Sequence, residues 1–299
     1  MNKGILAGIG AYILWGLFPI YWRLLEEVPA IEILANRMVW SFAFVAILLT
    51  VQKDWHWLRE VSRNRKTMLT YTLAAILLSV NWFTYIWAVN AGYVVEASLG
   101  YFINPLVNFL LGVIFLGEKL RGGQVAAVVL AGLGVVYLTV SYGSLPWISL
   151  VLAFTFGMYG LIKKTARLES MHGFSLETMV LFLPALFFLL YRESSGVGTF
   201  VQLGAVVTLL LVLSGPVTSI PLLLFGYSAR RIPLSMLGFI QYIAPTLQFL
   251  LGVFVFAEPF PPARMVGFSI IWMALLVYTL EGVFFNRKAK SDSSLVESL

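Results

Sequence analysis

Two stripes of polar side chains in otherwise apolar segments carry the recognition chemistry of this sequence. Tyr101, Asn104 and Asn108 follow i, i+3, i+7 spacing, so they share one face of a helix. Gln241 and Gln248 lie at the positions that correspond to Tyr101 and Asn108 in a later segment. Because polar groups at lipid depth face protein or water, both stripes are predicted to line a solute cavity. Amide hydrogen bonds between helices, without a solute, are the alternative.

Aromatic rings accompany these amides. Asn81 and Tyr85 are i, i+4 neighbours that could orient an amphipathic solute, while Trp15 and Trp82 offer ring faces to a flat or cationic one. Other tryptophans, Trp22 among them, are expected to anchor the protein at the membrane interface. The predicted substrate-binding set is Trp15, Arg37, Asn81, Trp82, Tyr85, Tyr101, Asn104, Asn108, Gln241 and Gln248.

Charges are scarce within the apolar segments, and Arg37 stands out, about one turn inside the segment 33–51. It is interpreted as binding an anionic group or pairing with Glu96 in an outer gate. The alternative is a side chain that snorkels to the outer headgroups. Glu118 and Glu258 end their segments, where they are expected to bind neighbouring backbone or cations in a gate, or to serve the structure alone.

A carboxylate proton relay is not evident from the sequence. Glu96, Glu177 and Glu281 all lie near the ends of segments, and none is predicted to be buried in mid-span. Lys163 is a weaker candidate for function, because basic residues belong at the inner end of a span in any case. The coupling mechanism therefore stays open.

Prolines within the apolar segments leave backbone carbonyls unbonded and can form bends or gates. The candidates for gate or structural roles are Pro105, Pro216, Pro221 and Pro245. Pro216 and Pro221 lie five residues apart. The segment 202–227 is therefore predicted to be the broken or flexible element.

The segments that position these residues identify the class of protein. Of the 299 residues, 60% are hydrophobic and 11% are charged, whereas about a quarter are charged in a soluble domain. The apolar segments have the length of membrane-spanning helices, about 20 residues. They cover residues 4–24, 33–51, 68–90, 97–117, 123–141, 145–162, 175–191, 202–227, 234–257 and 263–284. We predict an all-α integral membrane protein with ten transmembrane helices.

The basic residues predict the orientation of the chain. With the N-terminus inside, 16 of the 20 Lys and Arg residues fall on the cytoplasmic side. Cytoplasmic loops retain Lys and Arg, so both termini are predicted to be cytoplasmic. The net charge of +6 is then an orientation signal and no sign of a nucleic-acid partner. The chain has no cysteine and only two histidines, both between segments, so no metal site or cofactor is expected.

The sequence matches itself at an offset of 140 residues. Pro105, Gly112 and Glu118 fall on Pro245, Gly252 and Glu258 in one register. Five spans are an odd number, so the second copy of a five-span unit enters the membrane from the opposite side. Such inverted repeats recur in secondary transporters, whose solute site lies between the halves. The predicted units are residues 1–142 and 143–285, followed by a cytoplasmic tail, 286–299.

These residues resemble the EamA family of the drug/metabolite transporter superfamily. The resemblance rests on Trp15-Gly16, Arg37, Pro105, Gly117-Glu118 and the repeated Pro and Glu of the second half. The opening Gly-Ala-Tyr-Ile-Leu-Trp-Gly-Leu-Phe-Pro-Ile-Tyr-Trp, residues 10–22, is similar to the RarD subgroup. One departure is Ala244, which stands where the first half has Asn104.

The resemblance implies a multi-pass carrier of the bacterial inner membrane, built from two inverted EamA repeats around a central cavity. The fifth and tenth helices would brace the outside. Its solutes would be small metabolites or drug-like amphipathic molecules, exported by alternating access. The expected partners are the lipid bilayer and a small-molecule substrate, with protons as candidate coupling ion, and the chain would act as a monomer or weak dimer.

Two other classes of function remain as alternatives. A channel or a structural membrane protein would need no alternating access. An integral-membrane enzyme would need a catalytic group, yet the sequence has no H-E-x-x-H, G-x-S-x-G or phosphate-binding loop motif and no cysteine nucleophile. An enzyme is therefore not expected.

Overall fold

The computed structural model describes residues 2–90, 94–142 and 147–255, together with 262, 265–267, 269–274, 276–278 and 280–281. All regular structure in these residues is helical. Eight helices are long and apolar enough to cross a membrane. They are α1 (Lys3–Arg23), α2 (Ala30–Val51), α4 (Arg65–Asn90), α5 (Val94–Leu116), α6 (Gly122–Tyr142), α7 (Trp147–Thr165), α8 (Ser170–Ser194) and α9 (Ala205–Ala229). The prediction of an all-α membrane protein is confirmed.

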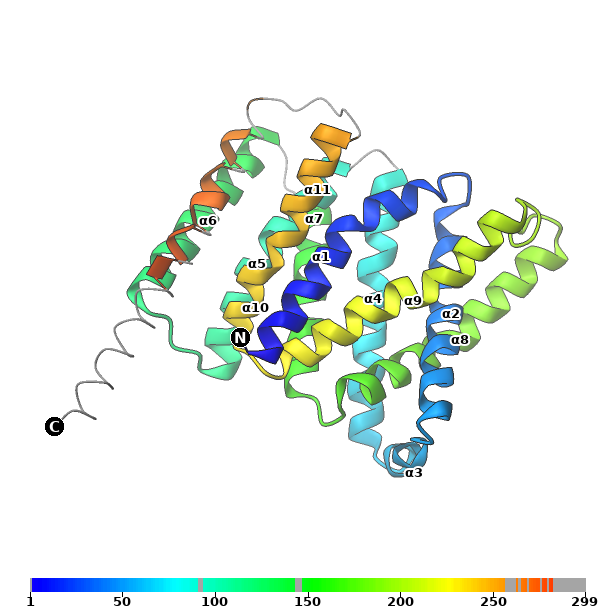
Figure 1. The fold of residues 1–299 in the computed structure, drawn as a ribbon. Helices are drawn as coiled ribbons and strands as arrows, with labels where there is room; N and C mark the ends of the chain where they lie inside the picture. Colours follow the sequence, from blue (N-terminus) through cyan, green and yellow to red (C-terminus); the bar gives the residue numbers. More distant parts are fainter. Residues whose placement is uncertain are drawn as a thin grey trace.

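The remaining helices are shorter. The helix α3 (His56–Ser62) precedes α4, and three consecutive helical pieces replace the predicted span 234–257. These pieces are α10 (Leu234–Gln241), α11 (Ile243–Leu250) and the π-helical turn η1 (Leu251–Val255), with α10 and α11 nearly in line (Figure 1). An apolar helix of fewer than 18 residues runs over Met265–Tyr278. The predicted count of ten spans is not tested by the described residues and stays a prediction.

The helix that breaks is not the one that the sequence predicts. The helix α9 continues from Ala205 to Ala229 through Pro216 and Pro221, so the predicted break in 202–227 is wrong for this conformation. The interruption falls at Tyr242, between α10 and α11. Pro245 has no N–H, so the carbonyl of Gln241 lacks its helical donor at this point.

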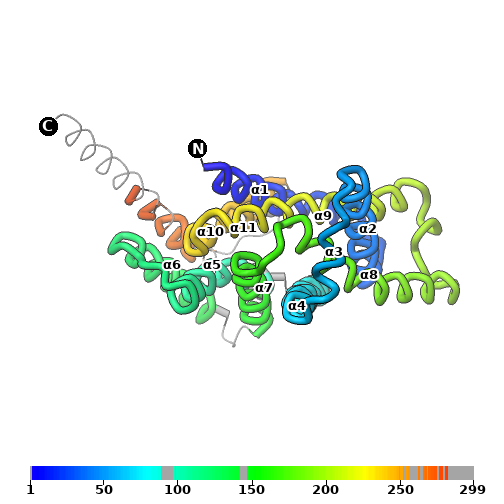
Figure 2. The backbone as a smooth tube through the Cα atoms, turned by 90° about the horizontal axis from the view of Figure 1, so that it is seen from below, coloured from blue at the N-terminus to red at the C-terminus, as the bar shows by residue number. Residues whose placement is uncertain are grey.

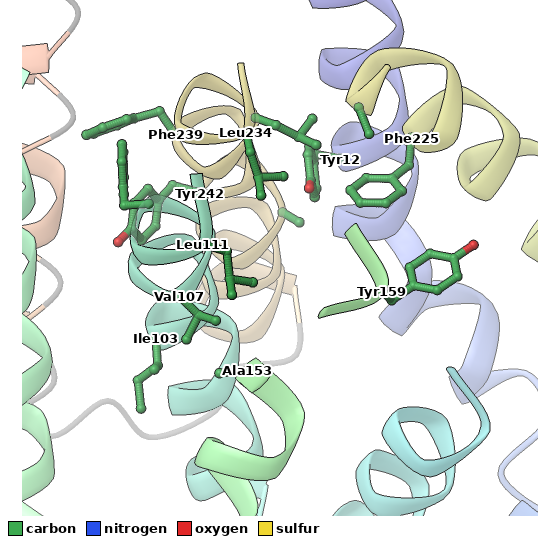
Figure 3. Close-up of a cluster of buried hydrophobic side chains, with 14 of the residues drawn as sticks. Tyr12, Ile103, Val107, Leu111, Ala153, Tyr159, Phe225, Leu234, Phe239 and Tyr242 are labelled. Carbon is green, nitrogen blue, oxygen red and sulfur yellow. The ribbon is translucent and has the colours of Figure 1, made fainter. Parts of the chain in front are cut away.

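The helices pack in two layers (Figure 2). One layer contains α1, α9, α10 and α11, and the facing layer contains α4, α5 and α7. The helix α5 packs against α7 and α10, while α2 packs against α8 and α9. Side chains from both ends of the chain meet in one buried cluster, to which Tyr12, Tyr159, Phe225 and Tyr242 contribute (Figure 3).

The helix α6 lies at the edge of the molecule beside the C-terminal apolar helix (Figure 1). Arg121 forms an ion pair of 2.8 Å with Glu281. A Cβ atom on Gly134 would lie 2.9 Å from Cγ1 of Ile271, so the glycine permits close packing. This placement agrees with the bracing role that the family resemblance implies.

The helix starts repeat with the offset found in the sequence. Ala30 and Ser170 begin α2 and α8, and Arg65 and Ala205 begin α4 and α9. Each pair lies 140 residues apart. The register of the sequence match therefore extends over two pairs of helices.

The small residues of α1 let it approach its neighbours closely, and this generates a stability prediction. A Cβ atom on Gly16 would lie 2.7 Å from Cβ of Leu247 and 3.3 Å from the carbonyl oxygen of Ala244. We expect Gly16→Ala to lower the free energy of unfolding by about 1–3 kcal/mol, because α1 and α11 would be forced apart. Thermal unfolding of the purified protein in detergent measures this.

Gly10→Ala is the matched control in the same helix. A Cβ atom there would meet only Cδ1 of Leu224, at an ordinary contact distance of 3.6 Å. Alanine also favours a helix over glycine by about 0.5–1 kcal/mol, so the control should be neutral or stabilising. Equal melting temperatures for the two variants would contradict the proposed packing of Gly16.

Candidate functional site

Arg37 lies about two turns inside α2 and points into the protein. Only 6% of the residue is exposed, so snorkelling to the headgroups is wrong for this conformation. Its Nε donates a hydrogen bond of 2.9 Å to Oγ1 of Thr218 on α9. The guanidinium carbon lies 4.6 Å from the ring centroid of Trp22 and 4.3 Å from that of Trp82. Two aromatic faces thus bracket a buried cation.

The charge of Arg37 has no carboxylate partner among the described side chains. Glu96 lies near the start of α5, but its side chain is outside the described residues, so its pairing with Arg37 stays a prediction. A guanidinium has five N–H donors, and Thr218 accepts from one. Stacking on tryptophan stabilises a desolvated cation by about 2 kcal/mol, less than burial costs it. The remaining donors therefore suit an anionic ligand.

Two tyrosines complete the surroundings of this cation. The rings of Tyr85 on α4 and Tyr101 on α5 meet edge to face with centroids 5.5 Å apart. Both lie close enough to interact with the charge of Arg37, and both are partly exposed. We name the group of Trp22, Arg37, Trp82, Tyr85, Tyr101 and Thr218 the Arg37 cluster.

The Arg37 cluster unites four predicted residues with two that sequence reasoning missed. Arg37, Trp82, Tyr85 and Tyr101 come together from three helices. Trp22 was expected to be an interfacial anchor, which stays a prediction, and its contact with Arg37 was not foreseen. Thr218 is fully buried. Its position as a polar residue between the two prolines of an apolar helix is the sequence signal that could have identified it.

The predicted amide stripes meet in a hydrogen-bond network between helices. Nδ2 of Asn108 donates to Oε1 of Gln241 at 3.0 Å and to Oδ1 of Asn104 at 3.2 Å. Nδ2 of Asn104 donates to the carbonyl of Ala153 at 2.8 Å, and the Tyr12 hydroxyl donates to Gln241 at 3.4 Å. In this conformation the amide N–H groups bond to other amides and to backbone, as the interhelical alternative describes, while the buried Oδ1 of Asn108 has no hydrogen-bond partner among the described residues. Their contact with a solute stays a prediction.

The other predicted binding residues hold neighbouring helices together. Nδ2 of Asn81 donates to the carbonyl of Leu152 at 2.8 Å and to Oγ1 of Thr155 at 2.9 Å. Nε2 of Gln248 donates to the carbonyl of Trp15 at 3.1 Å. The Trp15 ring packs edge-on against Phe156, with centroids 5.6 Å apart. None of these contacts reaches the Arg37 cluster.

Glu118 caps a helix of the other half of the chain. Its Oε1 accepts from the Leu234 N–H at 2.6 Å, and its Oε2 accepts from the N–H and hydroxyl of Ser235 at 3.0 and 2.6 Å. A carboxylate at a helix N-terminus is stabilised by the unpaired N–H groups. Gly112 leaves room for it, since a Cβ there would lie 2.8 Å from Oε2. Glu258, the predicted counterpart, lies outside the described residues.

A buried ion pair was missed by sequence reasoning. Nζ of Lys163 lies 2.9 Å from Oε1 of Glu177, and the Tyr159 hydroxyl donates to Oε2 at 3.0 Å. Glu177 is fully buried, so its expected place near the end of a span was misleading. The i, i+4 spacing of Tyr159 and Lys163 on α7 was the available signal.

Comparisons with known proteins match the chain over nearly its whole length. Residues 2–140 match the model of the EamA-like transporter family. Protein RarD of Streptomyces exfoliatus is 50% identical over 97% of this chain and 92% of its own. The uncharacterized transporter YojE of Bacillus subtilis is 47% identical over 97% of this chain and 98% of its own.

A crystal structure of a protein at 19% identity has the same fold, with a TM-score of 0.70 over 93% of this chain and 98% of that one. The fold, the apolar helices and the full-length relatives agree with one another. The chain belongs to the EamA-like transporter family of multi-pass membrane proteins and to its RarD subgroup.

Proposed function

We propose that this protein is a secondary carrier that exports small amphipathic solutes with an anionic group by alternating access. The observation that carries this proposal is the Arg37 cluster, a buried cation between two tryptophan rings, with donors left uncommitted by the described residues. The guanidinium would bind a carboxylate or a similar anion through paired hydrogen bonds. The rings of Trp82, Tyr85 and Tyr101 would hold the apolar body of the solute.

The proposed architecture is two inverted repeats, residues 1–142 and 143–285. The shared offset of 140 residues in two pairs of helix starts supports it, as does the family match over residues 2–140. An odd number of spans in each repeat would invert the second one, with both termini in the cytoplasm of a bacterial cell and the chain in its inner membrane. The tail 286–299 would then be cytoplasmic.

The contacts between the proposed repeats suit a gate. Glu118 of the first repeat caps α10 of the second, and Asn108 bonds to Gln241 across the same boundary. In the proposed cycle these hydrogen bonds hold one side of the cavity closed and break when the halves rock. The backbone break before Pro245 gives α10 and α11 a place to bend. The proposed site keeps Trp15, Asn81, Asn104 and Gln248 as residues that contact solute in other states.

Two further features belong to the proposal. Protons are the proposed coupling ion, and the carrier works as a monomer or weak dimer. A channel would conduct without rocking, but the names of the relatives are those of transporters or of RarD proteins. Alternating access can therefore be tested directly against conduction.

The first test concerns the solute. Purified protein in vesicles should exchange N-acetylphenylalanine at least about tenfold faster than its neutral amide, because only the carboxylate can bind Arg37. Arg37→Gln should remove this preference, and Arg37→Lys should lose much of it because lysine lacks the planar fork. Metabolite profiling of cells that overexpress or lack the protein extends the test to natural solutes.

Arg63→Gln is the matched control, since Arg63 is an exposed residue beside α3. It should leave exchange and preference unchanged. Equal rates for the acid and the amide in the wild-type protein would contradict the anionic group. An Arg37→Gln variant that folds and keeps the wild-type preference would contradict the assignment of the site.

The second test concerns alternating access. The chain has no cysteine, so the single variants Asn104→Cys and Gln248→Cys can be labelled with a membrane-impermeant maleimide from either side. We expect a transported solute to raise labelling from one side and lower it from the other, because it shifts the population of two states. Gln202→Cys, at an exposed position, should not respond. Labelling at both sites that never changes with solute would exclude the carrier.

A further inference from the structure

The buried pair of Lys163 and Glu177 has the geometry of an isolated acid–base site. Lys163 lies near the end of α7 and Glu177 lies seven residues inside α8. The two side chains are 3% and 0% exposed, and 2.9 Å separates Nζ from Oε1. The second carboxylate oxygen accepts from the Tyr159 hydroxyl at 3.0 Å. Each oxygen of Glu177 therefore has one donor from α7.

Stability alone does not explain this pair. Removing two charges from water costs several kcal/mol for each, and apolar side chains of similar size are often at least as stable in their place. Ionisable residues at membrane depth accordingly mark ion pathways more often than structural joints. The pair of Arg167 and Glu60 shows the contrast, since its side chains are 68% and 71% exposed at the surface.

The described neighbours of the Lys163–Glu177 pair are aromatic rings and a glycine, and none of them carries a formal charge. Rings of Tyr159 on α7 and Tyr71 on α4 lie 5.6 and 5.8 Å from Nζ of Lys163. From α9 the neighbour is Gly226, where a Cβ atom would come 3.1 Å from Cε of Lys163. The hydroxyl of Tyr71 is engaged with the backbone of Leu168. Among the described side chains, Lys163 has no second carboxylate within ion-pair distance.

Nearby charged groups have partners of their own. Lys164 donates to the carbonyls of Ala229 and Ile232, and Arg230 donates to those of Ala166 and Leu168. On α8, His172 bonds to Asp54 at 2.6 Å and its ring stacks on Trp57. A proton added to the pair is therefore not shared with these groups.

We propose that the Lys163–Glu177 pair is the proton-binding site of the carrier, an assignment that rests on the proposed function. A proton from water adds to a carboxylate oxygen of Glu177, and the ion pair becomes a neutral acid beside an ammonium. The charge of the pair changes from zero to +1, and no covalent bond other than the new O–H forms. The ammonium has then lost its counter-ion, which favours a conformation where Lys163 reaches water.

The helix α7 connects this site to the solute side of the protein. The Tyr159 ring stacks on Phe225 with centroids 6.0 Å apart, and Figure 3 shows the two side by side. One turn earlier, Phe156 contacts Trp15. The backbone of the same helix accepts the amides of Asn81 and Asn104. A shift of α7 against α8 therefore changes contacts of four helices at once.

The test measures the response of the empty protein to protons, with no solute. The Gln248→Cys variant is labelled with an impermeant maleimide from outside and from inside the vesicles, at pH 6 and pH 8. The ratio of the two rates at one pH cancels the effect of pH on the thiol. We expect this ratio to change about fivefold between the two pH values when Gln248→Cys is the only substitution, because protonation shifts the two-state population.

Adding Glu177→Gln should abolish this change, since the amide cannot take up the proton. The pair of substitutions Lys163→Met and Glu177→Leu removes both charges with little change in volume and should be equally insensitive, which covers the case where the single variant does not fold. Glu60→Gln, at the exposed ion pair, is the control and should respond like the protein with Gln248→Cys alone. A pH response that persists in a folded variant without Glu177 would overturn the proposal.

The outcome also separates this proposal from the function on which it rests. A protein that exchanges solute but shows no pH response contradicts the proton site and leaves the carrier intact. Wild-type protein that exchanges none of the solutes tested contradicts the carrier. A pair that serves stability alone would lower the melting temperature when removed and leave the pH response unchanged, which also overturns the proposal.

Discussion

Polar and charged groups at membrane depth must find their partners inside the protein, because hydrocarbon offers none. Most described groups of this kind obey the constraint. Glu118 accepts three hydrogen bonds, the amides of Asn104 and Asn108 are bonded across helices, and Glu177 has Lys163 and Tyr159. Arg37 has one hydrogen bond and two aromatic contacts within the described part of the chain, which leave donors over, and the buried Oδ1 of Asn108 has no partner there. An external ligand gains the most at groups of this kind.

The same constraint explains how the two parts of the chain are joined. Helix N-termini expose N–H groups that lipid cannot satisfy, and α10 starts inside the protein. A carboxylate from the end of α5 fills that need, and Gly112 makes its approach possible. These hydrogen bonds add to an apolar contact between the same two helices, where the ring centroids of Phe109 and Phe239 lie 4.7 Å apart.

The sequence predicts what depends on local composition, and it fails where distant segments decide. Apolar length is local, so the first eight predicted spans agree with helices to within about five residues, whereas the predicted span 234–257 is divided into three pieces. The neighbours of Arg37 come from four other helices, and only a resemblance or a structure can bring Trp22 and Thr218 to it. Glu177 was misjudged for the same reason. Its carboxylate is bound by Tyr159 and Lys163 of α7, and α8 packs against α4 and α9, which the position of Glu177 along α8 does not encode.

Prolines show the limit most clearly. The closely spaced Pro216 and Pro221 suggested a break, yet α9 stays continuous, whereas a single Pro245 coincides with the interruption. A missing N–H breaks a helix only if the surrounding packing does not hold the backbone in place. Gly215 of α9 packs closely against Trp40 of α2, and the Ser41 hydroxyl of α2 donates to the Gly215 carbonyl. Tertiary contacts therefore decide at which of several prolines a helix is interrupted.

The two buried cations Lys163 and Arg37 differ in whether the described residues supply a carboxylate partner. Lys163 has its carboxylate within the chain, so its neutrality can be changed only by a proton. Arg37 has no carboxylate partner among the described residues, so an anionic solute can neutralise its charge. An anion bound to Arg37 would lower the energetic cost of burying that cation, whereas protonation of Glu177 would raise the cost of burying Lys163. If both sites act on the same rocking motion, the two events would favour opposite conformations. Exchange of a proton for an anion would then follow from electrostatics, with no need for contact between the two ligands.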